Sequence, residues 1–126
     1  MKNMFLLFSH KLTNEQIIDA KKVLKVDDFV YLPNDLQSLW SNVPAELESL
    51  KSYLLPLKEY IKNNAKKDDC VLIQGDFGAV YEMVNYAKKL NLTPVYATTK
   101  RETQEEIQKE KVVKISKFKH IRYRKY

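Results

Sequence analysis

One stretch of the chain changes from a continuous apolar run to apolar residues at a helical period. The run Cys70–Ile73 has the length and β-branched content of a buried strand. It ends at the turn Gln74–Gly78. Beyond the turn, apolar residues recur at spacings of three and four: Val80, Met83, Val84 and Ala87. The pattern predicts a strand, a tight turn and a helix whose apolar face lies against a sheet.

The chain before this stretch predicts two further strands with a capped helix between them. Met4–Phe8 and Phe29–Leu32 are short apolar strands. Thr13 and Gln16 have the spacing of a capping box, so a helix is expected from Asn14 to Leu24. Its inner face is expected to consist of Ile17, Ile18, Ala20, Lys21 and Leu24.

Two prolines divide the next segment. Pro33 starts a short helix that runs through Trp40. Leucines then repeat at helical spacing, and Pro56 is expected to bend or break the helix that they form. The repeat consists of Leu47, Leu50, Leu54, Leu57 and Ile61, and the polar turn 63–69 follows it.

The C-terminal third contains two more predicted strands. Val95–Thr98 is the first, followed by a loop, Thr99–Arg101, and a polar helical segment, Glu102–Glu110. In the final segment one parity holds Val113, Ile115, Ile121 and Tyr123, and the other holds Phe118, His120, Arg122 and Arg124. The alternation predicts one apolar and one basic face on an antiparallel edge strand or hairpin, bulged near Ser116 to Lys117.

Strands that alternate with helices favour an α/β fold, in which a mostly parallel sheet is flanked by helices and the C-terminal strand is antiparallel. At 126 residues the chain is expected to form one domain, residues 1–126. The single cysteine, Cys70, excludes a disulfide framework and a cysteine metal cluster. Apolar runs are too short for a membrane span or a signal peptide, so the cytoplasm is the expected location.

The net charge of +6 is concentrated at the end of the chain. Residues 111–126 contain seven basic residues and no acidic residue. Such a block is typical of an anion-binding surface, although a solvated edge strand has the same composition.

The chain has two glycines, Gly75 and Gly78, and both lie in the turn that precedes the central helix. Glycine permits positive φ and the close approach of a ligand, and a helix N-terminus attracts anions. A phosphate or a ribose is therefore a candidate ligand. The alternative is that a short loop simply needs glycine. The turn lacks the GxGxxG fingerprint and the P-loop GK[ST], so neither a dinucleotide site nor a nucleoside triphosphate site is predicted.

The carboxyl ends of parallel strands share one edge of a sheet. Three segments are therefore expected side by side: Ser9 with His10, then Gln74–Gly78, then Thr98–Arg101. Singly, each residue has a structural explanation. His10 could simply form a hydrogen bond within a loop, and Thr98 could end a strand. Phe77 and Tyr81 are each more simply interpreted as core residues.

Five segments resemble a family of small accessory proteins of type III CRISPR systems. The matching segments are FLLFSHKLT, YLPNDLQSLWSNVP, VLIQGDFGAVYEMVNYA, PVYATTKR and FKHIRYRKY. The resemblance implies a CRISPR-associated Rossmann-like fold, a homodimer, and binding or degradation of cyclic oligoadenylate messengers, chiefly cyclic tetra-adenylate.

On this basis the chain is expected to be a ring nuclease that needs neither a metal nor a cofactor. Lys100 and Arg101 are candidates for phosphate binding and transition-state stabilisation, His10 for general acid or base, and Ser9 for orienting the ribose. The other candidate ligand-binding residues are Gln74, Gly75, Asp76, Phe77, Gly78, Tyr81, Thr98, Thr99, His120 and Arg122. The two histidines are far apart in sequence, which disfavours a metal-dependent hydrolase.

Two other functions are compatible with the same residues. A sponge would sequester the messenger without cutting it, since cleavage differs from binding only in how the 2′-OH is placed. A nucleic-acid-binding regulator would use the basic segment 111–126, but no stable binding of duplex DNA and no membrane partner is expected. A two-fold homodimer with its axis through the ring is the expected assembly.

Overall fold

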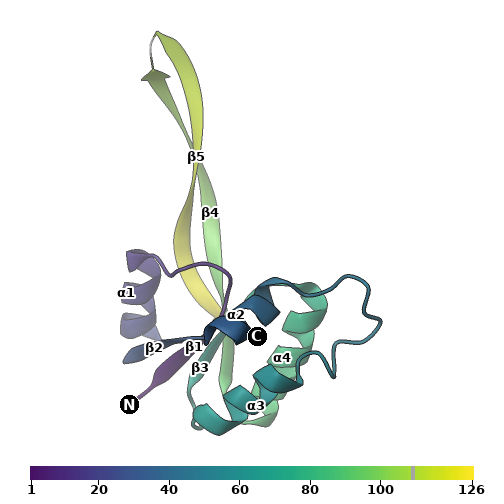
Figure 1. Ribbon diagram of the computed structural model, residues 1–126. Coiled ribbons are helices and arrows are strands. Elements are labelled where there is room, and N and C mark those ends of the chain that lie inside the picture. The colour runs from purple at the N-terminus through teal and green to yellow at the C-terminus, as the bar shows by residue number, and fades with distance from the viewer. Residues whose placement is uncertain (109) are drawn as a thin grey trace.

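The protein is a mixed α/β structure built on a five-stranded sheet (Figure 1). The computed structural model describes residues 1–108 and 110–126, except the side chains at positions 104, 106, 108 and 116. The strand order is β2-β1-β3-β4-β5; the first four strands are parallel, and β5 is antiparallel to β4. The elements are β1 (Asn3–Leu7), α1 (Asn14–Val23), β2 (Asp28–Tyr31), α2 (Asn34–Ser41), α3 (Leu55–Asn64), β3 (Cys70–Ile73), α4 (Phe77–Lys89), β4 (Thr93–Gln108) and β5 (Lys111–Lys125). The predicted fold class is confirmed at this level.

Helices cover both faces of the sheet (Figure 1). Alternate residues of β1 point to opposite faces, because successive side chains of a strand alternate. Met4 and Leu6 pack in the core beneath α1, whereas Phe5 and Leu7 pack in the core beneath α2, α3 and α4. The sheet is therefore the middle layer of three.

The predicted capping box of α1 is present. The backbone N–H of Gln16 donates to Thr13 Oγ1, and the backbone N–H of Thr13 donates to Gln16 Oε1 at 2.9 Å. The predicted inner face is partly wrong, since Ile18 is exposed whereas Gln16 is buried with Ala20. The capping bond fixes Gln16 against the sheet, and Ile18 then falls on the outer side of the helix.

The leucine repeat forms a shorter helix than its period predicts. Pro56 lies in the first turn of α3, where its missing N–H costs no hydrogen bond. It therefore starts the helix instead of bending one. Leu47 and Leu50 lie in the connection from α2, while Leu54 and Leu57 are fully buried.

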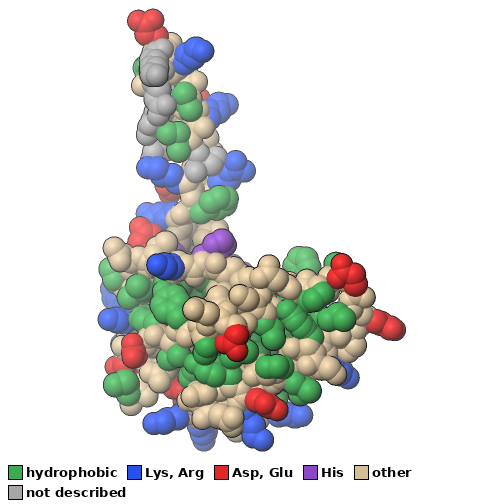
Figure 2. Space-filling view, viewed as in Figure 1, with side chains coloured by type: hydrophobic (Ala, Val, Ile, Leu, Met, Phe, Trp, Pro, Cys, Tyr) green, Lys and Arg blue, Asp and Glu red, His purple; other side chains and the backbone are tan. Residues whose placement is uncertain are grey.

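Strand β4 continues ten residues beyond the body of the sheet and pairs with β5 throughout. We call this projecting ribbon, residues 99–108 with residues 111–120, the arm (Figures 1 and 2). The predicted loop Thr99–Arg101 and the predicted helical segment Glu102–Glu110 are both wrong, since residues 99–108 belong to β4 and Glu110 lies in a turn, while position 109 lies outside the described residues. Polar composition favoured a helix locally, but the neighbouring β5 supplies the backbone hydrogen bonds that stabilise a strand.

A β-bulge lies where the arm joins the body. Thr98 pairs with Arg122 and Thr99 pairs with His120, so Ile121 is an extra residue. The Arg122 amide N donates to Thr98 Oγ1 at 3.2 Å, and Thr98 Oγ1 donates to the Arg122 carbonyl at 2.9 Å. The bulge predicted near Ser116 to Lys117 is therefore wrong.

The bulge also changes which side chains of β5 share a face. An extra residue shifts the alternation by one position. Tyr123 consequently shares the α1 side with His120, and the two rings lie 4.9 Å apart. The predicted grouping, which separated these two residues and placed His120 with Arg122, is wrong.

Candidate functional site

The carboxyl edge of the parallel strands brings together two of the three expected segments at a topological switch point. The strand order reverses between β1 and β3, and such a point is where open α/β sheets usually bind ligands. Here the indole of Trp40 lies at this edge. Trp40 Nε1 donates to the Gln74 carbonyl at 3.0 Å, and a Cβ on Gly75 would lie 3.1 Å from the same nitrogen. The absence of a Cβ at Gly75 thus makes room for the indole of Trp40.

Neither Gly75 nor Gly78, both of which the structure describes, has a positive φ. The expected conformational reason for the glycines is therefore wrong. At Gly78, an added Cβ would lie 3.4 Å from a Leu50 methyl group, which is ordinary contact. Close packing against Trp40 explains Gly75.

Gln74 and Asp76 make hydrogen bonds that hold the turn in place. The backbone N–H of Gln74 donates to the Leu7 carbonyl, and the side-chain oxygen Oε1 of Gln74 accepts from the backbone N–H of Ala97 at 2.9 Å. Asp76 is the N-cap of α4 and accepts from the Ala79 amide N at 3.0 Å. Both residues were candidates for ligand binding. In the structure their side chains accept hydrogen bonds from backbone N–H groups of the protein itself.

Ser9 and His10 lie at the same edge, after β1. Ser9 Oγ is 3.0 Å from Ser41 Oγ, and Gln37 Nε2 donates both to Ser41 Oγ and to the Phe8 carbonyl. His10 is exposed, and its ring meets the Phe8 ring edge-on at 5.4 Å. His10 is accordingly accessible to a ligand, whereas Ser9 is held toward α2.

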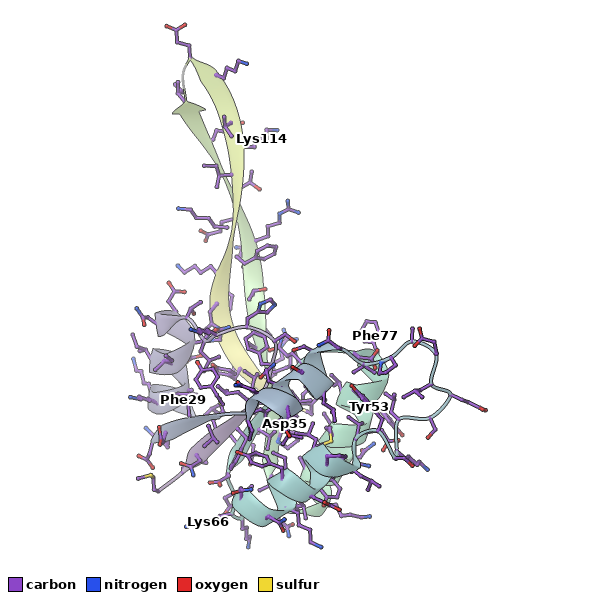
Figure 3. All side chains as sticks on the ribbon, viewed as in Figure 1. Phe29, Asp35, Tyr53, Lys66, Phe77 and Lys114 are labelled. Carbon is purple, nitrogen blue, oxygen red and sulfur yellow. The ribbon has the colours of Figure 1, made fainter. Side chains whose placement is uncertain are left out.

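The two aromatic residues at the start of α4 are exposed. Phe77 is 94% exposed (Figure 3) and Tyr81 is 70% exposed, so their interpretation as core residues is wrong. They line a hollow of about 240 Å³, which we call the aromatic groove. Its residues are Phe77, Val80, Tyr81, Val84, Asn85 and Tyr126. A protein surface with such large exposed rings is suited to stacking against a flat ligand.

A row of cations begins beside this groove. The Tyr126 ring lies 4.8 Å from the Tyr96 ring, and Arg124 lies over Tyr96 and donates to its hydroxyl oxygen at 3.2 Å. Arg122 is opposite Thr98, two residues along β4, and Lys100 is opposite Lys119 two residues further. We call Lys100, Lys119, Arg122 and Arg124 the cationic stripe. Lys100 and Lys119 are like charges in directly opposite positions, which is unfavourable unless an anion lies nearby.

Strand alternation divides the third expected segment between two faces. Thr98 and Lys100 share the α4 side, whereas Thr99 and Arg101 share the α1 side. Thr99 lines a hollow of about 400 Å³ beside the N-terminus of α1. Lys100 and Arg101 therefore cannot both reach one phosphate from the same face. A loop, as expected from the sequence, would have allowed it.

His120 is part of a partly buried contact between the arm and α1. His120 Nε2 is 2.7 Å from Asp19 Oδ2, and the imidazole is 5% exposed. The neighbouring Tyr123 hydroxyl donates to the Gln16 carbonyl at 3.0 Å. His120 thus attaches the base of the arm to α1 on the face opposite the cationic stripe.

Burial raises the pKa of two acidic groups in this layer. Desolvation is the main cause for the Tyr123 phenol and for the Cys70 thiol, whose ordinary values are 10.0 and 9.0. Above those values the unfolded chain loses protons that the folded chain retains, so stability decreases as the pH rises. We expect a slope of up to about 1.4 kcal/mol per pH unit for each group.

Urea unfolding between pH 8 and pH 11 measures this slope. Tyr123→Phe should reduce it above pH 10, although it also removes the hydrogen bond to Gln16. A slope above pH 10 that is unchanged in Tyr123→Phe would contradict the attribution of this pH dependence to the Tyr123 phenol.

Among the described residues, no group of three His, Cys, Asp or Glu side chains could hold a metal ion. No described helix has the length and apolarity that a membrane span requires.

Comparison with known proteins places the chain in a family. Residues 2–124 match the family described as "Uncharacterized protein MJ1673 family". The chain belongs to this family. A relative from Methanocaldococcus jannaschii, described as "Uncharacterized protein MJ1673", is 56% identical over 126 residues, which cover 100% of this chain and 98% of the relative. No solved structure matches the chain.

Several residues of the site were not anticipated from the sequence. They are Asp19, Trp40, Tyr96, Lys119 and Tyr126. For Tyr96, the signal was available, because Tyr96, Thr98 and Lys100 alternate with Val95 and Ala97 along β4. For Trp40 and Asp19 only tertiary packing reveals the contact.

Proposed function

We propose that the protein binds a cyclic oligoadenylate, cyclic tetra-adenylate first, at the aromatic groove and the cationic stripe, and linearises it. The observation that carries the proposal is the joint presence of Phe77, Tyr81 and Tyr126 with Arg122, Arg124 and Lys100 on one side of the sheet. Receptors of single-stranded nucleic acids combine cations for the phosphates with aromatic rings for the bases. In this proposal the sheet is a Rossmann-like variant whose usual crevice is occupied by Trp40, and the ligand lies beside it.

The spacing of the cations supports a ligand with several phosphates. Side chains two residues apart in a strand are separated by about 7 Å. Arg124, Arg122 and the Lys100–Lys119 pair therefore present charge in successive steps away from the groove. The guanidinium groups can each bind a phosphate through two N–H donors. A ring with its adenine on Phe77 or Tyr81 would extend its phosphates along the stripe.

Cleavage would proceed without a metal. The ribose 2′-oxygen attacks the phosphorus, the bond from phosphorus to the 5′-oxygen breaks, and a proton passes to that oxygen. Lys100 is our candidate for stabilising the charge on the phosphate, and the exposed imidazole of His10 for the proton transfer. Positioning and electrostatic stabilisation contribute most of the rate in such a reaction. In a type III CRISPR system this reaction would end signalling in the cytoplasm.

Incubation of the purified protein with labelled cyclic tetra-adenylate in EDTA tests the proposal. We expect linear products with 2′,3′-cyclic phosphate or 3′-phosphate ends, formed in excess over the protein. Tight binding with recovery of the intact ring after denaturation would instead favour the sponge. If neither cleavage nor binding occurs at micromolar ligand, the proposal is wrong.

A single-stranded nucleic acid is the second candidate ligand. The observation in its favour is that residues 93–126 contain ten basic and four acidic residues, whereas residues 1–92 contain twelve of each. The whole net charge therefore lies on β4, β5 and their turn. Binding of labelled single-stranded RNA that weakens steeply with salt and that cyclic tetra-adenylate does not displace would favour this candidate.

A further inference from the structure

The arm differs in charge between its two ends. Its outer part, residues 102–117, contains four acidic and four basic residues and is therefore neutral. Glu102 pairs with Lys117 and Glu105 pairs with Lys114 across the two strands. The excess of positive charge lies at the base, near the cationic stripe. The outer part is thus not adapted to a polyanion.

Exposed apolar side chains lie at both ends of one face of the arm. On the α1 side, Ile107 and Val112 are opposite each other near the tip and are 81% and 65% exposed. Phe118 lies on the same face near the base, opposite Arg101, and is 72% exposed. Between them are Thr103 and the Glu105–Lys114 pair. Figure 2 shows the arm rising clear of the body, with hydrophobic and charged side chains along it.

This face can pack against the same face of a second arm that runs in the opposite direction. A two-fold axis across the middle of the arm places Val112 of one chain on Phe118 of the other, and Ile107 on Arg101, the cross-strand neighbour of Phe118. The same operation places Glu105 opposite Thr103 and Lys114 opposite position 116, so no like charges meet directly. A hollow of about 400 Å³ beside Phe118, lined by Thr99, His120 and the first turn of α1, could receive the aliphatic tip.

We propose that two copies of this chain associate through antiparallel arms packed by their α1-side faces. The contact is isologous and closes as a dimer, because each tip occupies the base of the other arm. It differs from the ring-centred dimer expected from the sequence, since its axis crosses the arms. It does not depend on the proposed ligand.

The exposure of the arm supports a partner in solution. A two-stranded ribbon alone is marginally stable in water, and its unpaired edges and apolar side chains favour association. At about 3.3 Å per residue the ten arm residues of β4 extend about 33 Å, long enough to span a second arm from base to tip. Among the described side chains of this face, Arg101 and Lys114 are basic and Glu105 is acidic, so its net charge is only +1. A weakly charged face with three exposed apolar side chains fits another copy of itself better than it fits RNA or an anionic membrane.

Light scattering at micromolar concentration should give about twice the monomer mass of 14.9 kDa. Val112→Lys should convert the protein to a monomer, because it places a charge in the apolar contact. Val113→Lys is the matched control, since Val113 is the neighbouring valine on the other face of the arm and should leave the dimer intact. Circular dichroism establishes that both variants fold.

Disulfide trapping tests the direction of the arms. In one chain, positions 112 and 118 are six residues apart on the same strand, about 20 Å, which is too far for a disulfide. A variant with both Val112→Cys and Phe118→Cys should nevertheless form disulfide-linked dimers on mild oxidation. Each single variant alone should not, and the native Cys70 is buried.

Three results would overturn the inference: a monomeric wild type, a Val112→Lys variant that remains dimeric, or a dimer that forms only after single-stranded RNA or anionic vesicles are added. The first and third can occur whether or not cyclic tetra-adenylate is bound, so they leave the proposed function intact.

Discussion

Trp40→Ala is expected to lower the free energy of unfolding by about 3–5 kcal/mol, the cost of emptying a large aromatic site in a packed core. The Trp40 side chain is 2% exposed and packs with Phe5, Leu36 and Leu57 in the core beneath α2, α3 and α4. Because small domains are stable by about 5–15 kcal/mol, this loss is a large share of the total. Urea unfolding, followed by circular dichroism, measures it.

The conservative variant Trp40→Phe separates packing from hydrogen bonding. It retains an aromatic ring but leaves the Gln74 carbonyl without the indole N–H, which costs about 1–3 kcal/mol. A Trp40→Ala protein with an unchanged unfolding midpoint would contradict the role of the indole at the sheet edge.

Lys100→Ala combined with Arg122→Ala is expected to weaken binding of cyclic tetra-adenylate by about 100-fold or more. Hydrogen bonds to charged groups contribute about 1.5–3 kcal/mol each, so each lost cation weakens binding by about tenfold or more. The backbone N–H of Arg122, which bonds to Thr98, is unaffected by the change. Isothermal titration calorimetry at fixed ionic strength provides the measurement.

Lys114→Ala is the matched control for this double variant. Lys114 is a cation of the same ribbon, but it lies on the α1 side and toward the tip (Figure 3). Its removal should leave the affinity within about twofold, since exposed charges more than a Debye length away are largely screened. Equal losses in the two proteins would indicate nonspecific attraction and would contradict a defined site on the stripe.

The parallel part of the sheet could be predicted because its signals are local. Cys70–Ile73 is an uninterrupted apolar run, and Thr13 with Gln16 forms a cap that is encoded within four residues. The position of the site at the carboxyl edge of the sheet followed from topology, since the strand ends of a parallel sheet share one edge. These features do not depend on knowing which distant residues pack together.

The arm and the occupied crevice depend on contacts that are distant in sequence. Residues 102–108 are polar and have no strong preference for a strand; their pairing with residues 111–117 decides their structure. A bulge is recognisable only from the register of two strands, so the faces of β5 could not be assigned from its parity alone. Trp40 reaches the Gln74 carbonyl across 34 positions of sequence. For this reason the site was expected at the glycine turn, whereas the exposed cations and rings lie beside it.

The extra residue at Ile121 determines where the arm points. A bulge bends its strand and increases the local twist, and here it lies at the junction between a rigid sheet and a ribbon about 33 Å long. A small change of angle at the junction becomes a displacement of several ångströms at the tip. Deletion of Ile121 would remove no cross-strand pair, because Ile121 has no partner in β4, yet it would change the direction of the tip. One residue without a strand partner would then decide whether two arms can meet.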